Sequence, residues 1–223
     1  MKNYVIKQTF MYWWIKKLRT YLIKIKYADL FQTKCKILNH GHYKINKTII
    51  GQKGKLIIGK NSILDHVDIR IVGMNNTINI GKNCYIGKNC SIWLEGNNIT
   101  VTIGNGCNFT HDTQICAQEN NSCITIGNDC MLSHHINIRT SDSHIIYDTI
   151  TGKRLNYSQS VTIGNHVWIA PEVKIMKGCN IGDCSIIGSN AIVTHSTPAN
   201  SLVVGIPAKV VKNNVDWKRD KLF

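Results

Sequence analysis

Aliphatic residues recur at every sixth position in the C-terminal third of the chain. The series runs through Ile163, Ile169, Ile175, Ile181, Ile187 and Val193. The position four residues after each of them is mostly occupied by a small residue. An amphipathic helix repeats every 3.6 residues and a half-buried strand every second residue, so neither element explains a period of six. The period predicts short strands separated by tight corners, with one aliphatic side chain of each unit pointing into a common core.

A second repeat, 23 residues long, precedes this series. It relates Ile80 to Ile103 and Ile126, Gly81 to Gly104 and Gly127, Cys84 to Cys107 and Cys130, and Asn75 to Asn98 and Asn121. Three six-residue units account for 18 residues, and the other five fall near MNN, GNN and ENN, where asparagine is typical of turns. We therefore expect a parallel coil of triangular cross-section over residues 55–212, with three strands per turn and about six stacked turns.

The repeat is interrupted by a long insertion, residues 139–160, where the spacing between successive core isoleucines grows to 37 residues. The insertion begins RTSDSHIIYD and carries His144, with Asp142 before it and Asp148 after it. Loops held by a rigid scaffold often carry function. A neutral imidazole suits general base catalysis near pH 7, and Asp142, Asp148 or a backbone carbonyl could orient the ring. Taken alone, His144 is better explained as a solvated loop histidine.

The two ends of the chain lie outside the repeat. Within the N-terminal segment 1–54, residues 4–27 predict an amphipathic helix, because apolar side chains recur there at helical spacing. The apolar stripe consists of Phe10, Trp14, Leu18, Tyr21 and Ile25. We expect the stripe to pack against the coil or a partner subunit, and peripheral contact with an anionic membrane surface is the alternative. Residues 213–223 are expected to form a short helix or tail.

Composition adds information about charge and compartment. The 27 Lys and Arg residues outnumber the 13 Asp and Glu residues, and the net charge of +14 favours anionic partners such as an acidic polysaccharide, an anionic lipid or a phosphorylated cofactor. No helix-turn-helix, zinc-finger or RNA-binding signature accompanies the charge, so no nucleic-acid partner is expected. No apolar run is long enough for a transmembrane helix or a signal peptide, and the nine cysteines show no disulfide framework. We expect a cytoplasmic protein, with a peripheral position on the inner face of the membrane as the alternative.

The segments IGNHVWIAPEVKIMKGCNIGDCSIIGSNAIV and VVGIPAKVVK closely resemble the terminal coils of the hexapeptide-repeat acyltransferases. The resemblance covers about residues 55–212. It implies an all-β fold, a left-handed parallel β-helix, whose hand runs against the usual crossover rule and comes from the family alone. It also implies a homotrimer with active sites between subunits.

The resemblance extends to individual residues. In the sugar and polysaccharide O-acetyltransferase branch, a histidine in a polar loop precedes a VWIG-like strand, and this chain has SDSH at 141–144 and HVWIA at 166–170. The match implies that His144 is the general base and that Trp168 lies beside the acyl group, with its backbone N–H as a donor to the oxyanion. Positions that match contacts to coenzyme A are Ala170, Ser189, Thr194, Lys209 and Lys212. The chain has His195 where the family often has lysine, so the phosphate contact there differs.

The remaining histidines allow other interpretations. Zinc could bind where His111, His134, His135 or His166 meet at a subunit edge, as in the β-helical carbonic anhydrases, but the expected close ligand pair is missing and we expect no metal. His111, Asp112 and Glu119 are also candidates for the acceptor side of the cleft. The cysteines that follow core aliphatics are expected to be buried small hydrophobes.

The leading interpretation is an O-acetyltransferase that moves an acetyl group from acetyl-CoA to a sugar hydroxyl of a bacterial surface polysaccharide or its precursor. One alternative keeps the reaction but takes a small acceptor such as an antibiotic, serine or a simple sugar. A third interpretation is a non-catalytic β-helical scaffold, which would not bind coenzyme A.

Overall fold

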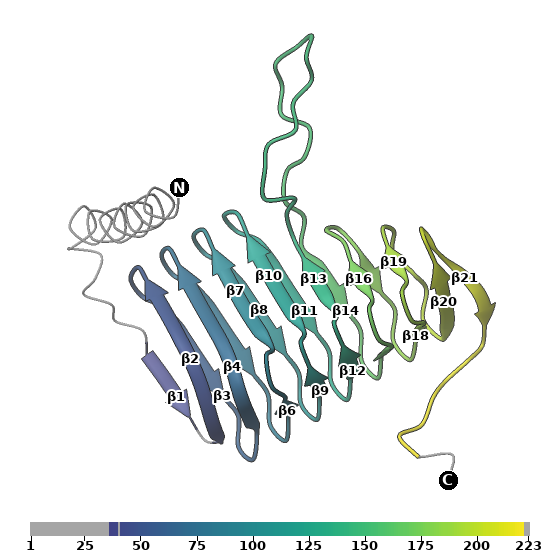
Figure 1. The fold of residues 1–223 in the computed structure, drawn as a ribbon, viewed down its shortest axis with the longest axis horizontal. Coiled ribbons are helices and arrows are strands. Elements are labelled where there is room, and N and C mark those ends of the chain that lie inside the picture. The colour runs from purple at the N-terminus through teal and green to yellow at the C-terminus, as the bar shows by residue number, and fades with distance from the viewer. Residues whose placement is uncertain (1–35, 40, 221–223) are drawn as a thin grey trace, which may run out of the picture.

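The six-residue units form short strands that stack in parallel, as the period predicts. The computed structural model describes residues 36–39 and 41–220, and these residues form a coil with three faces (Figure 1). Face A is a seven-stranded sheet of β1 (Lys36–Asn39), β3 (Lys55–Ile58), β5 (Thr77–Ile80), β8 (Thr100–Ile103), β11 (Cys123–Ile126), β14 (Val161–Ile163) and β17 (Asn180–Ile181).

The other two faces belong to one sheet that bends over an edge of the triangle. Face B contains β6 (Tyr85–Ile86), β9 (Asn108–His111), β12 (Met131–His134), β15 (Trp168–Ile169), β18 (Ile186–Ile187), β20 (Ser201–Gly205) and β21 (Ala208–Asn213). Face C contains β7 (Ser91–Glu95), β10 (Gln114–Gln118), β13 (Asn137–Arg139), β16 (Lys174–Ile175) and β19 (Ile192–Val193). The long strands β2 (His42–Ile50) and β4 (Ile63–Val72) span both faces, since β4 pairs with β6 at one end and with β7 at the other.

Each edge of the triangle is a stack of corners. The BC edge, between faces B and C, carries residues 111–113, 134–136, 170–173 and 188–190, and backbone hydrogen bonds such as Glu172 N to His134 O join successive corners. The CA edge, between faces C and A, carries residues 96–99, 119–122, 140–160, 176–179 and 194–197. The AB edge includes residues 164–167.

The core follows the sequence repeat directly. Ile80, Ile103, Ile126, Ile163 and Ile181 are paired one above another on face A and are at most 2% exposed. Burying each such side chain contributes about 1.5–3 kcal/mol before entropy is counted, and stacking joins these contributions into one core. The recurring cysteines are likewise buried, each with its Sγ near a carbonyl of the next coil, as Cys84 is to Gly104 at 3.0 Å.

The asparagine-rich turns also lie where the repeat predicts them. Asn75, Asn98 and Asn121 adopt left-handed backbone conformations, with φ of 58°, 57° and 62°. Asn75 Nδ2 donates to Asn98 Oδ1, and Asn98 Nδ2 donates to Asn121 Oδ1, both at 3.1 Å. Asparagine is among the few residue types that tolerate this conformation, so the spacing of 23 residues is a spacing of corners.

The coil begins earlier than residue 55. Strand β1 pairs in parallel with β3, and β2 pairs along its length with β4, so part of the segment assigned to an N-terminal lead-in belongs to the coil. The helix expected at residues 4–27 lies outside the described residues. In the described part of the chain, no helix is long and apolar enough to cross a membrane.

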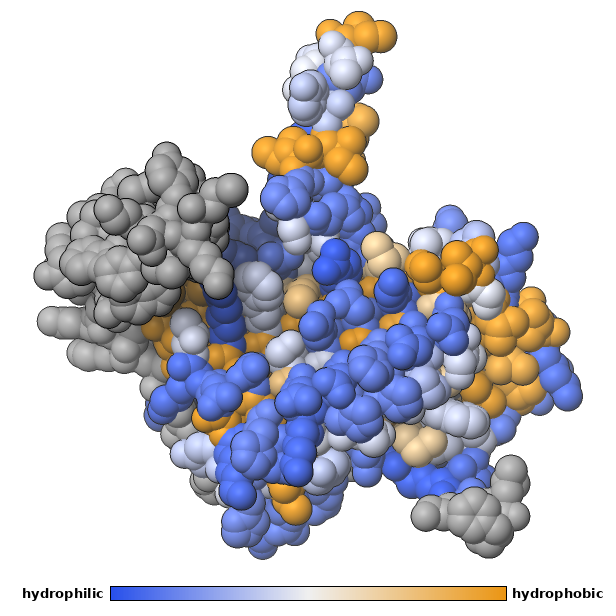
Figure 2. All heavy atoms as spheres, in the orientation of Figure 1, coloured by the Kyte–Doolittle hydropathy of each residue, from blue (hydrophilic) through white to orange (hydrophobic). Residues whose placement is uncertain are grey.

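Two segments depart from the coil. Residues 140–160, here called the arm, form a hairpin that projects from the CA edge, closed by the antiparallel bridge between Tyr147 and Arg154 (Figure 1). Apolar side chains are exposed along the arm, including Ile150 at 94% exposure (Figure 2). At the other end, β21 turns back antiparallel to β20, and residues 214–220 form a tail without a helix.

Candidate active site

His144 lies at the base of the arm, five residues after β13. Its side chain is exposed, and among the described residues its imidazole has no hydrogen-bond partner. It lines a pocket of about 330 Å³. The other lining residues are Glu95, Gln118, Glu119, Ser141, Ser143, Ile145 and Arg154. An exposed ring without a partner is free to accept a proton from a bound hydroxyl group.

The main chain at His144 is held by Asn156, a residue that the sequence pattern did not single out. Asn156 is 7% exposed and uses both ends of its amide. Its Nδ2 donates to His144 O at 2.7 Å and to Asp142 Oδ2 at 2.9 Å, and its Oδ1 accepts from Ile146 N at 2.7 Å. The base of the arm therefore has a defined conformation although its far end is exposed.

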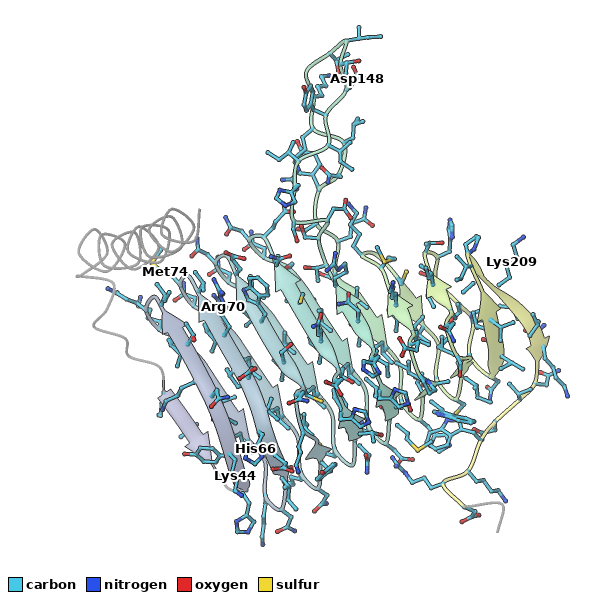
Figure 3. All side chains as sticks on the ribbon, in the orientation of Figure 1. Lys44, His66, Arg70, Met74, Asp148 and Lys209 are labelled. Carbon is cyan, nitrogen blue, oxygen red and sulfur yellow. The ribbon has the colours of Figure 1, made fainter. Side chains whose placement is uncertain are left out.

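Neither carboxylate predicted to orient His144 contacts its ring. Asp142 forms an ion pair with Lys177 at 2.5 Å, and hydrogen bonds from Lys177 and then Asn156 hold the pKa of Asp142 below its usual range. Asp148 lies near the outer end of the arm, where its Oδ1 accepts from the backbone of Ile150 and Thr151 (Figure 3). Asp142 acts on His144 only through Asn156, and Asp148 caps its own turn.

Glu119 is the acceptor-side candidate that the structure brings to His144. Its Oε1 pairs with Arg154 Nη2 at 2.6 Å and accepts from Ser141 Oγ at 2.7 Å. The hydrogen bond from Arg154 is the main reason that the pKa of Glu119 is lowered. His111 and Asp112, the other two candidates, lie on the BC edge and do not line this pocket.

Trp168 lies on β15 in face B, and its backbone cannot play the role predicted for it. Its backbone N–H donates to Ser185 O at 2.9 Å as part of the coil, so that N–H is not available to an oxyanion. The indole N–H of Trp168, by contrast, has no partner among the described residues. The indole N–H is therefore the group of Trp168 that can donate a hydrogen bond to a bound substrate.

The C-terminal tail packs beside Trp168. Trp217 is 7% exposed, stacks on His166 at 4.2 Å between ring centroids, and lies 6.2 Å from the Trp168 ring. Trp217 Nε1 donates to His166 O at 2.8 Å, while Arg219 pairs with Asp129 at 2.8 Å. The sequence pattern did not indicate this contact, because Trp217 and His166 are 51 residues apart in the chain.

His166 connects the tail to the coil, because one ring nitrogen contacts a carboxylate of the coil and the other contacts a carbonyl of the tail. Its Nδ1 lies 2.6 Å from Asp129 Oδ2, and its Nε2 lies 3.0 Å from Trp217 O. Burial lowers the pKa of His166, but the hydrogen bonds to Trp217 and Asp129 outweigh it and leave that pKa above its usual value. The protonated ring therefore binds the tail more strongly than the neutral ring does.

The residues predicted to contact coenzyme A lie along the last coils but on different edges. Ala170 and Ser189 occupy neighbouring corners of the BC edge, and Lys209 is exposed on β21 (Figure 3). Thr194 follows β19 on the CA edge, where its Oγ1 lies 2.9 Å from His195 Nδ1. Lys212 is exposed and pairs with Leu202. Within one chain, His144 and Thr194 thus lie on the CA edge, whereas Ala170, Ser189 and the neighbouring Trp168 lie on the BC edge or face B.

The sequence has relatives with this architecture. Residues 160–195 match the family model of the bacterial transferase hexapeptide (six repeats). The chain is 34% identical over 180 residues to the polysialic acid O-acetyltransferase of Neisseria meningitidis, a match covering 77% of this chain and 79% of that protein. The chain belongs to the hexapeptide-repeat acyltransferase family.

One further relative matches over only part of its length, and one solved structure matches over most of its length. The polysialic acid O-acetyltransferase of Escherichia coli O1:K1 / APEC is 35% identical over 82 residues, which are 37% of this chain but only 27% of that protein. The crystal structure of the polysialic acid O-acetyltransferase OatWY has a TM-score of 0.71 and 27% identity, and the match covers 85% of this chain and 89% of that one. The fold of this family member is accordingly the left-handed parallel β-helix.

Proposed function

We propose that this protein transfers an acetyl group from acetyl-CoA to a hydroxyl group of an acidic bacterial polysaccharide of the polysialic acid class. The observation that carries the proposal is the match to the N. meningitidis polysialic acid O-acetyltransferase over most of both chains. The net charge of +14 supports an anionic acceptor. Arg154 lines the pocket of His144, where its guanidinium is paired with Glu119.

The chemistry assigned to this chain is direct acyl transfer. A ring nitrogen of His144 accepts the proton of the acceptor hydroxyl while that oxygen attacks the thioester carbonyl carbon. The Trp168 indole N–H donates a hydrogen bond to the carbonyl oxygen as negative charge develops there. The C–S bond then breaks, and the imidazolium of His144 returns its proton to the departing thiolate, so the enzyme is unchanged.

We infer that the active form is a homotrimer with each site between two chains. His144 and Thr194 lie on the CA edge, whereas Trp168 lies on face B. His144 and Trp168 must both reach the reacting thioester, but in a single chain one lies on the CA edge and the other on face B. Placing the CA edge of one copy against face B and the BC edge of the next brings the two halves together, and closed rotational symmetry repeats this contact.

The test measures thiol release from acetyl-CoA with polysialic acid as acceptor. We expect His144→Ala to lower kcat/KM by about 10²- to 10⁴-fold, which is the usual contribution of a general base. His66→Asn is the matched control, because His66 is also an exposed histidine but lies far from the arm (Figure 3). Equal rates for wild type and His144→Ala would refute the role of His144. Activity on simple sugars but not on the polymer would refute the proposed acceptor.

A further inference from the structure

Three histidines from two successive coils gather on the BC edge. His111 and His134 occupy paired positions of β9 and β12, and their rings stack at 5.0 Å between centroids with an interplanar angle of 2°. His135 follows directly and stands edge-on to both rings. His111 is held in place by Asp112, whose Oδ2 lies 2.5 Å from its Nδ1.

Glu172 adds a carboxylate from the next coil. His134 Nδ1 lies 2.9 Å from His135 Nδ1, and His135 Nδ1 lies 3.3 Å from Glu172 Oε1. All three ligand atoms lie within 4.8 Å of one another. Metal–nitrogen and metal–oxygen distances of about 2.0–2.2 Å place tetrahedral ligand atoms roughly 3.3 Å apart, so the two separations from His135 Nδ1 are already within a few tenths of an ångström of what such an ion needs.

We propose that His134, His135 and Glu172 form a binding site for a divalent transition-metal ion such as Zn²⁺. Two imidazoles and one carboxylate are the ligand types that this class of ion prefers, and three protein ligands leave a coordination position open. We expected no metal from the sequence and did not consider Glu172 there, which is 37 residues away from His135 and is brought to it only by the long turn that contains the arm.

The proposed metal site borders a basic pocket, and the open coordination position of the metal ion would face this pocket. A pocket of about 400 Å³ on face C is lined by His135 and Asp112 together with Arg139 and Lys174. A bound cation would add positive charge at the rim of this pocket, so an anionic group such as a carboxylate or phosphate is the ligand class that fits the open position.

The test is direct binding of Zn²⁺ to the full, untagged chain by equilibrium dialysis, followed by Co²⁺ substitution and visible absorption. We compare wild type with His135→Asn and Glu172→Gln. Asparagine tolerates the left-handed conformation of His135, which has a φ of 54°, so the variant is expected to fold. His66→Asn is the control, because His66 also has a φ of 54° at a corner and pairs with a carboxylate, Asp65.

We expect wild type and His66→Asn to bind one Zn²⁺ at this site with equal affinity. His135→Asn and Glu172→Gln should each bind it at least tenfold more weakly, with loss of the Co²⁺ absorption. Equal binding by wild type and His135→Asn would overturn the proposal, leaving a histidine–histidine hydrogen bond at this corner. Weaker binding by the control as well would overturn it in favour of diffuse binding to surface histidines. Neither measurement involves acetyl transfer, so the result is independent of the proposed function.

Discussion

At the scale of single residues, the position of His144, the proposed general base, depends on a side chain to which the proposal gives no part in the reaction. Asn156 holds the carbonyl of His144 and the N–H of Ile146 from inside the arm. A general base must lie within hydrogen-bond reach of the proton it accepts, and a displacement of about 1 Å can cost roughly 100-fold in rate. Asn156 is therefore a positioning residue for His144.

Asn156→Ala is expected to lower kcat by roughly 10- to 100-fold while leaving KM for acetyl-CoA unchanged. It leaves the Ile146 N–H and the His144 carbonyl without their partner, which should also cost about 1–3 kcal/mol of local stability. Steady-state kinetics separates kcat from KM, and Thr149→Ala at the outer end of the arm is the control. A rise in KM for acetyl-CoA with unchanged kcat would contradict the positioning role.

Trp168 allows a substitution that distinguishes its two N–H groups. Trp168→Phe keeps an aromatic ring and the backbone N–H but removes the indole N–H. Because the backbone N–H already donates to Ser185 O, we expect kcat to fall by about 10²- to 10³-fold, as when an oxyanion donor is lost. Thiol release under saturating acetyl-CoA measures the effect. Full activity of Trp168→Phe would show that the indole donates nothing to the reaction.

At the scale of elements, the C-terminal tail should dock in a pH-dependent way. The folded-state pKa of His166 is raised, so its contribution to stability is fully present below the unfolded value of about 6.5 and is lost as pH rises through the folded-state pKa. Asp129 stays ionised over this range, since its pKa is lowered: burial raises it, but hydrogen bonds from His166 and Arg219 outweigh burial.

Urea unfolding of wild type and His166→Asn at pH 6 and at pH 9 tests the docking. The wild type should be more stable than the variant at pH 6, and the difference should shrink by pH 9. Asparagine suits the φ of 53° at this corner, so the variant isolates the loss of the imidazole. A difference that grows with pH would mean that the neutral ring is the form that holds the tail.

The coil and the site differ in how far the sequence predicts them. Ile103 and Asn98 each have counterparts 23 residues before and after them, so their burial and turn conformation follow from spacing alone. Asn156 and Trp217 belong to no repeat, and their partners depend on how the arm and the tail fold back. The wrong assignment of the Trp168 N–H has the same origin, because periodicity locates a strand but does not show which backbone groups its neighbours use.

At the scale of the whole molecule, the proposed site between two chains predicts that two inactive variants regain activity when they assemble into one trimer. His144→Ala chains lack the base but keep Trp168, and Trp168→Phe chains lack the indole N–H but keep His144. In a trimer with sites between chains, a site that takes His144 from one variant and Trp168 from the other is fully wild type.

Every trimer that passes through both tags contains both variants, and one of its three sites should combine an intact His144 with an intact Trp168, so about one third of the wild-type rate should be restored. The measurement is thiol release after the two chains are co-expressed with different affinity tags and purified through both tags in turn. Chains mixed after separate assembly are the control, and they should show only the mean of the two low rates. If each chain built its own site, co-assembled material would show that same low mean, because no site could then combine His144 with Trp168.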